Sequence, residues 1–104
     1  MAAFHQLPFT KFARSTGQHI AYSKLDPSVA STSASRTFVC VADLGEIRYT
    51  YRFLAPLLAQ AGHTAYMVDL RGMGDSSSRY SSYSVESCTE DIDALVESIA
   101  SPVA

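Results

Sequence analysis

Two short, uninterrupted apolar runs constrain the fold of this chain more than any other feature. The first covers residues 37–42 and reads TFVCVA, and the second covers residues 64–68 and reads TAYMV. Neither run alternates apolar with polar residues, which is typical of strands covered on both faces, as in a parallel sheet flanked by helices. A turn over residues 43–46 ends the first run, and Asp69 ends the second.

The segment between these runs has helical periodicity. Apolar residues at spacings of three and four predict a helix over Tyr51–Ala61, with one apolar face. Pro56 would break a helix interior, so we expect it near the first true turn, after a looser turn. Gly62 supplies the C-terminal stop. The predicted face consists of Phe53, Leu54, Leu57, Leu58 and Ala61.

A second helix is expected from Ser84, as its N-cap, through Ala100. Acidic residues in its N-terminal half complement the helix dipole. Ser87 and Glu90 form a second capping-box match, which leaves the start open by one turn. The apolar stripe of this helix consists of Val85, Cys88, Ile92, Leu95, Val96 and Ile99.

An antiparallel hairpin precedes these elements. Its strands are expected at Phe9–Arg14 and His19–Leu25, joined by a short loop that contains Gly17. Residues 1–25 lack Asp and Glu, as a transit peptide would, but their turn chemistry favours the hairpin. Residues 26–35 are rich in Ser and Pro and predict a loop.

The order hairpin, strand, helix, strand, helix predicts an α/β fold. Its strand–helix–strand unit implies a parallel pair with a right-handed crossover. The chain has 104 residues, which favours one domain or less.

Composition and charge argue against several classes of protein. The net charge of −2 gives no basic footprint for nucleic acid. No run approaches the roughly 18 apolar residues that span a bilayer, and the N-terminus lacks the apolar core of a secretory signal, so we expect no membrane partner and a cytoplasmic location. Cys40 and Cys88 are far apart, and the histidines and cysteines show no ligand pair at short spacing, so we expect neither a metal nor another cofactor.

The most specific stretch covers residues 69–77 and reads DLRGMGDSS. Gly72 and Gly74 allow a sharp turn off a strand end, and Asp69 and Asp75 can accept hydrogen bonds from backbone N–H groups or from Arg71. This run resembles the D-x-R-G-x-G-x-S segment of the α/β-hydrolase superfamily. Residues 51–62, YRFLAPLLAQAG, look like that family's first helix, and residues 83–86 lead into what looks like its next helix.

The resemblance covers about residues 9–100 and implies an incomplete α/β-hydrolase domain over residues 1–104. It implies that the strands here are the family's first four, and that the nucleophile elbow, G-x-S-x-G, belongs to the next one. The chain contains no G-x-S-x-G, and its histidines are His5, His19 and His63. No residue is therefore assigned as the family's catalytic serine, acid or histidine.

One functional element of the family is expected inside the chain. The loop after the third strand normally supplies a backbone N–H group to the oxyanion hole, which makes Leu44 the candidate donor. Asp43 stands where the family commonly has glycine, and a carboxylate there would oppose the stabilisation of an oxyanion. The alternative is that Asp43 and Leu44 form only a turn. For the loop of Asp69, Arg71, Gly72, Gly74, Asp75 and Ser76, a structural role is preferred to substrate contact.

Two rival motif readings are weaker. Gly72 and Gly74 follow a strand as in a dinucleotide fingerprint, but the third glycine position is Ser77 and the next helix begins too late to bind a pyrophosphate. Gly74-Asp75-Ser76 matches the block of another serine hydrolase group. The chain has no Asn and no His after His63, so Ser76 is expected to be a solvated loop serine.

The resemblance also implies that the strand at residues 38–41 is internal in the complete fold. In this chain it becomes an edge, which invites pairing with another strand. Two hypotheses follow. The chain is the N-terminal segment of a hydrolase that is inactive alone and acts on a small-molecule ester or amide only when completed by its missing C-terminal half. Alternatively, it is a non-catalytic interaction fragment that completes its sheet by self-association or with a partner.

Overall fold

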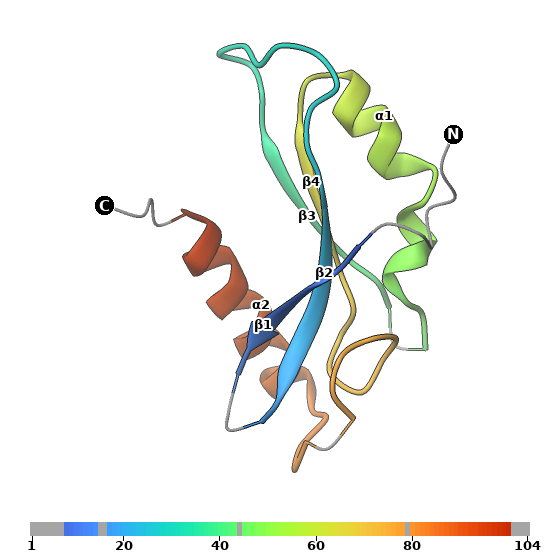
Figure 1. Ribbon diagram of the computed structural model, residues 1–104. Helices are drawn as coiled ribbons and strands as arrows, with labels where there is room; N and C mark the ends of the chain where they lie inside the picture. Colours follow the sequence, from blue (N-terminus) through green and yellow to red (C-terminus); the bar gives the residue numbers. More distant parts are fainter. Residues whose placement is uncertain (1–7, 15–16, 44, 79, 101–104) are drawn as a thin grey trace.

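A four-stranded mixed sheet forms the centre of the molecule (Figure 1). The structure, a computed structural model, describes residues 8–14, 17–43, 45–78 and 80–100. The strands lie in the order β1-β2-β4-β3. Their bounds are Thr10–Ala13 for β1, His19–Leu25 for β2, Thr37–Val41 for β3 and Thr64–Val68 for β4.

The strand pairing confirms the predicted hairpin and the predicted parallel pair. β1 and β2 are antiparallel, with Phe12 opposite Ile20, and β2 continues antiparallel onto β4. β3 and β4 are parallel, with Phe38 opposite Ala65. β3 pairs with β4 alone among the described strands and so lies at an edge of the sheet.

Helices cover both faces of this sheet (Figure 1). On one face lie the 3₁₀ turn η2, Arg48–Tyr51, and helix α1, Leu54–Gln60. On the other face lies α2, Val85–Ala100. Each face has its own apolar cluster. Cys40, Ala55, Ala65 and Met67 form the buried cluster under α1, and Ile20, Val68 and Leu95 form the one under α2.

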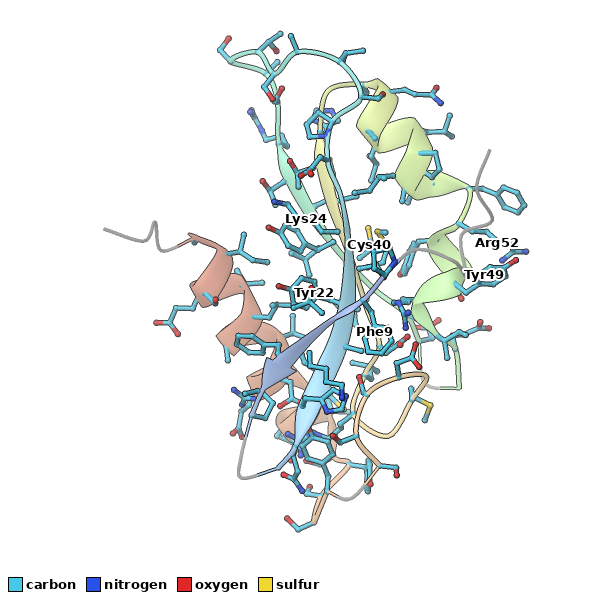
Figure 2. The ribbon with its side chains drawn as sticks, viewed as in Figure 1. Phe9, Tyr22, Lys24, Cys40, Tyr49 and Arg52 are labelled. Carbon is cyan, nitrogen blue, oxygen red and sulfur yellow. The ribbon has the colours of Figure 1, made fainter. Side chains whose placement is uncertain are left out.

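The side chains of β3 and β4 alternate between these two clusters, which explains why both runs are continuously apolar. Met67 packs toward α1, whereas Val68 packs toward α2. Figure 2 shows the same division, with Tyr22 on the α2 side of the sheet and Tyr49 and Arg52 on the opposite side. The fold class predicted from the sequence is therefore confirmed.

Helix α1 ends before Gly62 as predicted, but it begins at Leu54 instead of Tyr51 and buries only part of the predicted face. Pro56 lies in its first turn after η2, and at its end the N–H groups of Gly62 and His63 donate to the carbonyls of Ala59 and Leu58. The expected apolar face is wrong in part: Leu58 packs against the buried cluster, but Phe53 is 69% exposed and Leu57 is 60% exposed. The buried positions are Ala55 and Ala59, whose short side chains allow the helix to lie close to the sheet.

Helix α2 begins where its first capping signal predicts. The Ser84 hydroxyl accepts a hydrogen bond from the Ser87 N–H at 3.1 Å, which is the geometry of an N-cap. Leu95 is buried, and Ile92 and Ile99 pack beside it. Val85 and Val96 belong to the predicted stripe but are exposed. No helix in the described part of the chain is long and apolar enough to cross a membrane.

Candidate functional site

The loop that follows β4 is organised around the side chain of Asp69, which is fully buried. One carboxylate oxygen accepts the backbone N–H of Arg48 at 2.6 Å, and the other accepts the backbone N–H of Asp75 at 3.0 Å. The Arg48 guanidinium also pairs with Asp69. Asp69 thus joins the segment after β3 to the loop after β4.

Arg48 supplies the positive charge that pairs with Asp69, and no sequence pattern predicted this role. It is only 9% exposed, and its guanidinium also bonds the Ser23 hydroxyl at 2.9 Å and the Asp75 carboxylate at 2.8 Å. The expected cation was Arg71, which contacts neither Asp69 nor Asp75. An arginine next to a predicted turn, in a chain with only eight Lys and Arg, was the one signal available.

Gly72 and Gly74 have backbone angles φ of +79° and +49°, which residues other than glycine rarely adopt. A Cβ atom at Gly74 would lie 2.6 Å from Cγ of Asp69, and one at Gly72 would lie 2.6 Å from Cε1 of Tyr83. The loop therefore requires glycine twice, once to turn against the carboxylate and once to lie under an aromatic ring.

The expectation of a solvated Ser76 is wrong. Its side chain is buried, and its hydroxyl donates to the Asp69 carbonyl at 2.7 Å and accepts the Ala21 N–H at 2.8 Å. Because Ser76 follows a tight glycine turn, its hydroxyl is carried back onto the sheet. Both of its hydrogen bonds hold backbone, and neither is made to a base.

A serine–histidine contact that the sequence did not suggest lies beside it. Nε2 of His19 lies 2.8 Å from the carbonyl oxygen of Asp75, to which it donates, and Nδ1 lies 2.8 Å from the Ser77 hydroxyl. The Ser77 hydroxyl accepts the backbone N–H of His19 as well, and the Ser77 N–H donates to the His19 carbonyl. Together these four bonds tie the start of β2 to the loop.

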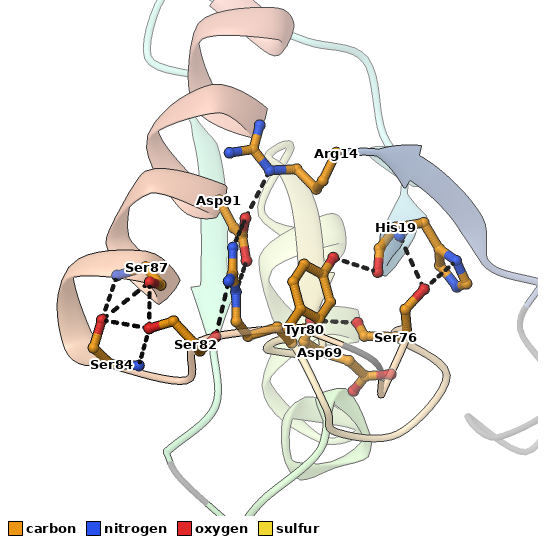
Figure 3. A network of polar contacts seen from close by, with 11 residues as sticks. Arg14, His19, Asp69, Ser76, Tyr80, Ser82, Ser84, Ser87 and Asp91 are labelled. Atoms are coloured by element: carbon orange, nitrogen blue, oxygen red, sulfur yellow. Dashed lines mark hydrogen bonds and ion pairs between the residues drawn. The ribbon is translucent and has the colours of Figure 1, made fainter. Parts of the chain in front are cut away.

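Arg71 belongs to a second polar cluster, shown in Figure 3. Its guanidinium makes two bonds of 2.7 Å to Asp91 of α2, whose side chain is almost fully buried, and Arg14 adds a third at 2.6 Å. The hydrogen bond to Asp91 raises the pKa of Arg71. Tyr80 stacks on Arg71 at 4.0 Å, and burial raises the pKa of its phenol. This cluster fixes α2 against the loop and the hairpin.

A cleft of about 310 Å³ opens at the carboxyl end of β3, between that strand and the first half of α2. Ligands bind at this end of the strands in open α/β sheets. Its wall is mainly apolar, with a few polar side chains. The lining residues are Val41, Ala42, Asp43, Leu70, Tyr83, Val85, Cys88, Thr89, Ile92 and Asp93.

The described lining of this cleft carries no activated nucleophile. Burial raises the pKa of the Cys88 thiol, so its reactive thiolate is scarce at neutral pH. Thr89 has no histidine beside it among the described lining residues. Asp43 is exposed at the cleft, where a carboxylate disfavours a developing oxyanion. Leu44, the candidate oxyanion donor, lies outside the described residues.

The residues from the predicted loop separate into these two polar clusters. Asp69, Gly74, Asp75 and Ser76 gather around Arg48, and Arg71 turns to Asp91. Over the described ranges, no group of three or more His, Cys, Asp or Glu side chains could hold a metal ion.

Comparison with solved structures identifies the fold. A haloalkane dehalogenase from Paraglaciecola agarilytica superposes with a TM-score of 0.77 at 24% identity, over 95% of this chain and 33% of that chain. An epoxide hydrolase from Vigna radiata gives 0.70 at 21% identity, over 95% and 29% of the two chains. A proline iminopeptidase from Mycobacterium smegmatis gives 0.73 at 14% identity, over 88% and 32%.

These neighbours are members of the α/β-hydrolase superfamily, and the chain has the fold of part of such a domain. It spans about a third of the length of the solved structures that it matches. No family model matches the sequence. No curated protein matches it either.

Proposed function

We propose that this chain supplies the opening part of an α/β-hydrolase domain and performs no hydrolysis alone. The observation that carries the proposal is the superposition of 95% of the chain on one third of a haloalkane dehalogenase. The family's chemistry is nucleophilic attack on an ester, amide or related bond, followed by hydrolysis of the covalent intermediate. Its elbow, acid and histidine have no counterpart in the 104 residues.

The polar clusters support a scaffold role. The hydroxyls of Ser76 and Ser77 are both bonded, the first to backbone and the second to backbone and to His19, and the Ser76 hydroxyl is buried. Arg48 and Arg71 are each bonded to buried carboxylates. Such groups hold the ends of β3 and β4 in a fixed geometry, and chemistry would be supplied by polypeptide added beside β3.

A fluorophosphonate probe tests the proposal, because it labels only serines that a neighbouring base activates. We expect no labelling of the purified chain above that of the urea-unfolded chain. Stable labelling that is lost in Ser77→Ala but kept in Ser81→Ala, an exposed loop serine, would contradict the proposal. The coding sequence after codon 104 gives an independent check, since an apolar strand followed by G-x-S-x-G would support the hydrolase lineage.

A second candidate function is a non-catalytic interaction module. The specific observation that favours it is the edge strand β3, whose Phe38 is 38% exposed and which carries no charged residue. Apolar edge strands readily add a further strand. A defined oligomer of the purified chain would support this candidate, and a strictly monomeric chain would oppose it.

A further inference from the structure

The cleft at the carboxyl end of β3 has the size of a site for a small molecule. Its volume of about 310 Å³ lies near the lower end of the roughly 300–1,000 Å³ that ligand pockets occupy. Val41 and Ala42 form one wall, at the end of the strand. The opposite wall is one face of α2, with Val85, Cys88 and Ile92 at helical spacing. A ligand of this cleft is therefore small and at least partly apolar.

The charge at this cleft is negative on both sides. Asp43 follows β3 and Asp93 lies on α2, both are exposed, and no Lys, Arg or His is among the described lining residues. Neither carboxylate forms a hydrogen bond or an ion pair with another described residue. A cleft with charge of one sign and an apolar wall concentrates ions of the opposite sign. We therefore expect the ligand to be a cation.

An organic cation suits the cleft better than a metal ion. Mg²⁺ and Ca²⁺ take about six or more oxygen ligands, whereas most of this wall is hydrocarbon. Tyr83 adds aromatic surface. Its hydroxyl donates to the Ser78 carbonyl and accepts the Tyr80 N–H, so the ring carbons are what it offers to a ligand. Aromatic rings attract ammonium groups, which adds a second preference for an organic cation.

We propose that this cleft binds a small organic cation, an aromatic or branched aliphatic group that carries one ammonium. The apolar group lies against the α2 face at Cys88 and Ile92, and the ammonium lies near the carboxylates of Asp43 and Asp93. The property of Asp43 that disfavours an oxyanion at this position therefore favours a cation. The proposal goes beyond the scaffold role and does not rest on it, because binding requires no bond cleavage.

Three phenyl compounds of similar size and different charge test the preferred sign of the ligand. They are 2-phenylethylammonium, 2-phenylethanol and phenylacetate, each titrated into the purified chain at pH 7 while backbone amide NMR shifts are recorded. We expect the ammonium compound to bind at least about fivefold more tightly than the alcohol, with shifts at Val41, Leu70 and Thr89, and phenylacetate to bind most weakly. No saturable shift with the ammonium compound, or equal or tighter binding of the alcohol, would overturn the proposal.

A matched pair of charge variants on α2 tests whether the attraction is local. Asp93→Asn should weaken binding of 2-phenylethylammonium about threefold and leave that of 2-phenylethanol unchanged. Glu97→Gln removes the same charge from an exposed position outside the cleft and should change neither. Equal weakening by the two variants would mean that the net charge of the chain attracts the probe, and it would contradict a site at the cleft.

A matched pair of tryptophan variants tests the location of the site. Thr89→Trp places an indole in the cleft and should abolish binding of both probes, whereas Ser98→Trp, at an exposed position near the end of α2, should not. Binding that survives Thr89→Trp would overturn the proposal. Thermal unfolding verifies that each variant is folded. Serine labelling, which tests the scaffold proposal, is independent of these titrations, so the two proposals can fail separately.

Discussion

At the residue scale, two buried carboxylates form the ion pairs that connect separate elements of this molecule. Asp69 connects the segments after β3 and β4 through Arg48, and Asp91 connects α2 to the hairpin through Arg14 and to the loop through Arg71. A buried ion pair adds little net stability, but removing one partner leaves an uncompensated charge. We therefore expect the fold to depend on these ion pairs, and replacing the arginine of each pair tests that dependence.

Arg48→Met leaves Asp69 without its guanidinium partner. We expect the free energy of unfolding to fall by about 3–5 kcal/mol, because the carboxylate stays buried. The matched control is Lys24→Met, whose partner Asp26 is 74% exposed, and there the loss should stay below about 1 kcal/mol. Urea unfolding at one fixed protein concentration measures both. Equal losses in the two variants would contradict the role given to Arg48.

Gly74→Ala adds a Cβ atom that overlaps the Asp69 carboxylate. Gly17→Ala is the matched control, because Gly17 also has a positive φ, of +73°, but has no atom within 4 Å of a built Cβ. The control should lose about 1–2 kcal/mol from the left-handed backbone alone. Gly74→Ala should lose clearly more, about 3 kcal/mol or above, in the same urea experiment. A smaller loss at Gly74 than at Gly17 would show that the close contact is not maintained.

The sequence predicted the loop but not its partners. A glycine pair after an apolar strand indicates a sharp turn, and the turn is present. Which cation meets Asp69 depends on how η2 lies against β4, and no local pattern encodes that packing. For the same reason Ser76, polar and within a loop, gave no sign that its hydroxyl would return to the sheet.

At the element scale, α1 shows that an apolar stripe does not identify a buried face by itself. Ala55 packs against the sheet and Ala59 is buried, whereas Phe53 and Leu57 remain exposed in the described structure. A short helix close to a sheet needs small residues at the contact, and alanine gives a weak periodic signal. The larger apolar residues dominate the pattern, although Phe53, Leu54 and Leu57 lie on the outer side.

Opposite substitutions on the two sides of α1 test this assignment. Ala55→Leu should lower the free energy of unfolding by about 1–3 kcal/mol, because the added side chain overpacks the contact with β4. Leu57→Gln, on the exposed side, should change it by less than about 0.5 kcal/mol. Chemical denaturation measures both changes. A larger cost at Leu57 would mean that the original apolar stripe is the buried one.

Helix α2 offers a chemical test through Cys88. Burial raises the pKa of its thiol, and a higher pKa leaves less thiolate at a given pH. We therefore expect iodoacetamide at pH 8 to alkylate Cys88 more slowly in the folded chain than in the urea-unfolded chain. Cys40, which is buried in the α1 cluster, should react more slowly still. Peptide mass mapping separates the two sites, and a folded-state rate above the unfolded one would contradict the assignment.

Strand positions were the most predictable part of the fold. The runs at residues 37–42 and 64–68 became β3 and β4 within one residue, because continuous β-branched and apolar residues fit a sheet covered on both faces. The N-cap at Ser84 was also predictable from the sequence, since its hydroxyl bonds to a backbone N–H only three residues away. The wrong predictions concern contacts between elements, which depend on side chains far apart in the sequence.

At the scale of the whole molecule, an open strand edge and an open cleft lie together. β3 forms one edge of the sheet, and the cleft of about 310 Å³ begins at the end of the same strand. The solved structures of this fold extend over about three times the length of this chain. The chain therefore has the fold of part of an α/β-hydrolase domain, and our proposal assigns none of its residues to bond cleavage.

Turnover of p-nitrophenyl acetate by the purified, folded chain tests most directly the claim that this chain performs no hydrolysis alone. The account predicts a rate no higher than that of His19→Ala, which removes the one histidine found bonded to a serine in the described structure. Saturable hydrolysis by the wild-type chain that disappears in His19→Ala, while that variant remains folded, would contradict it.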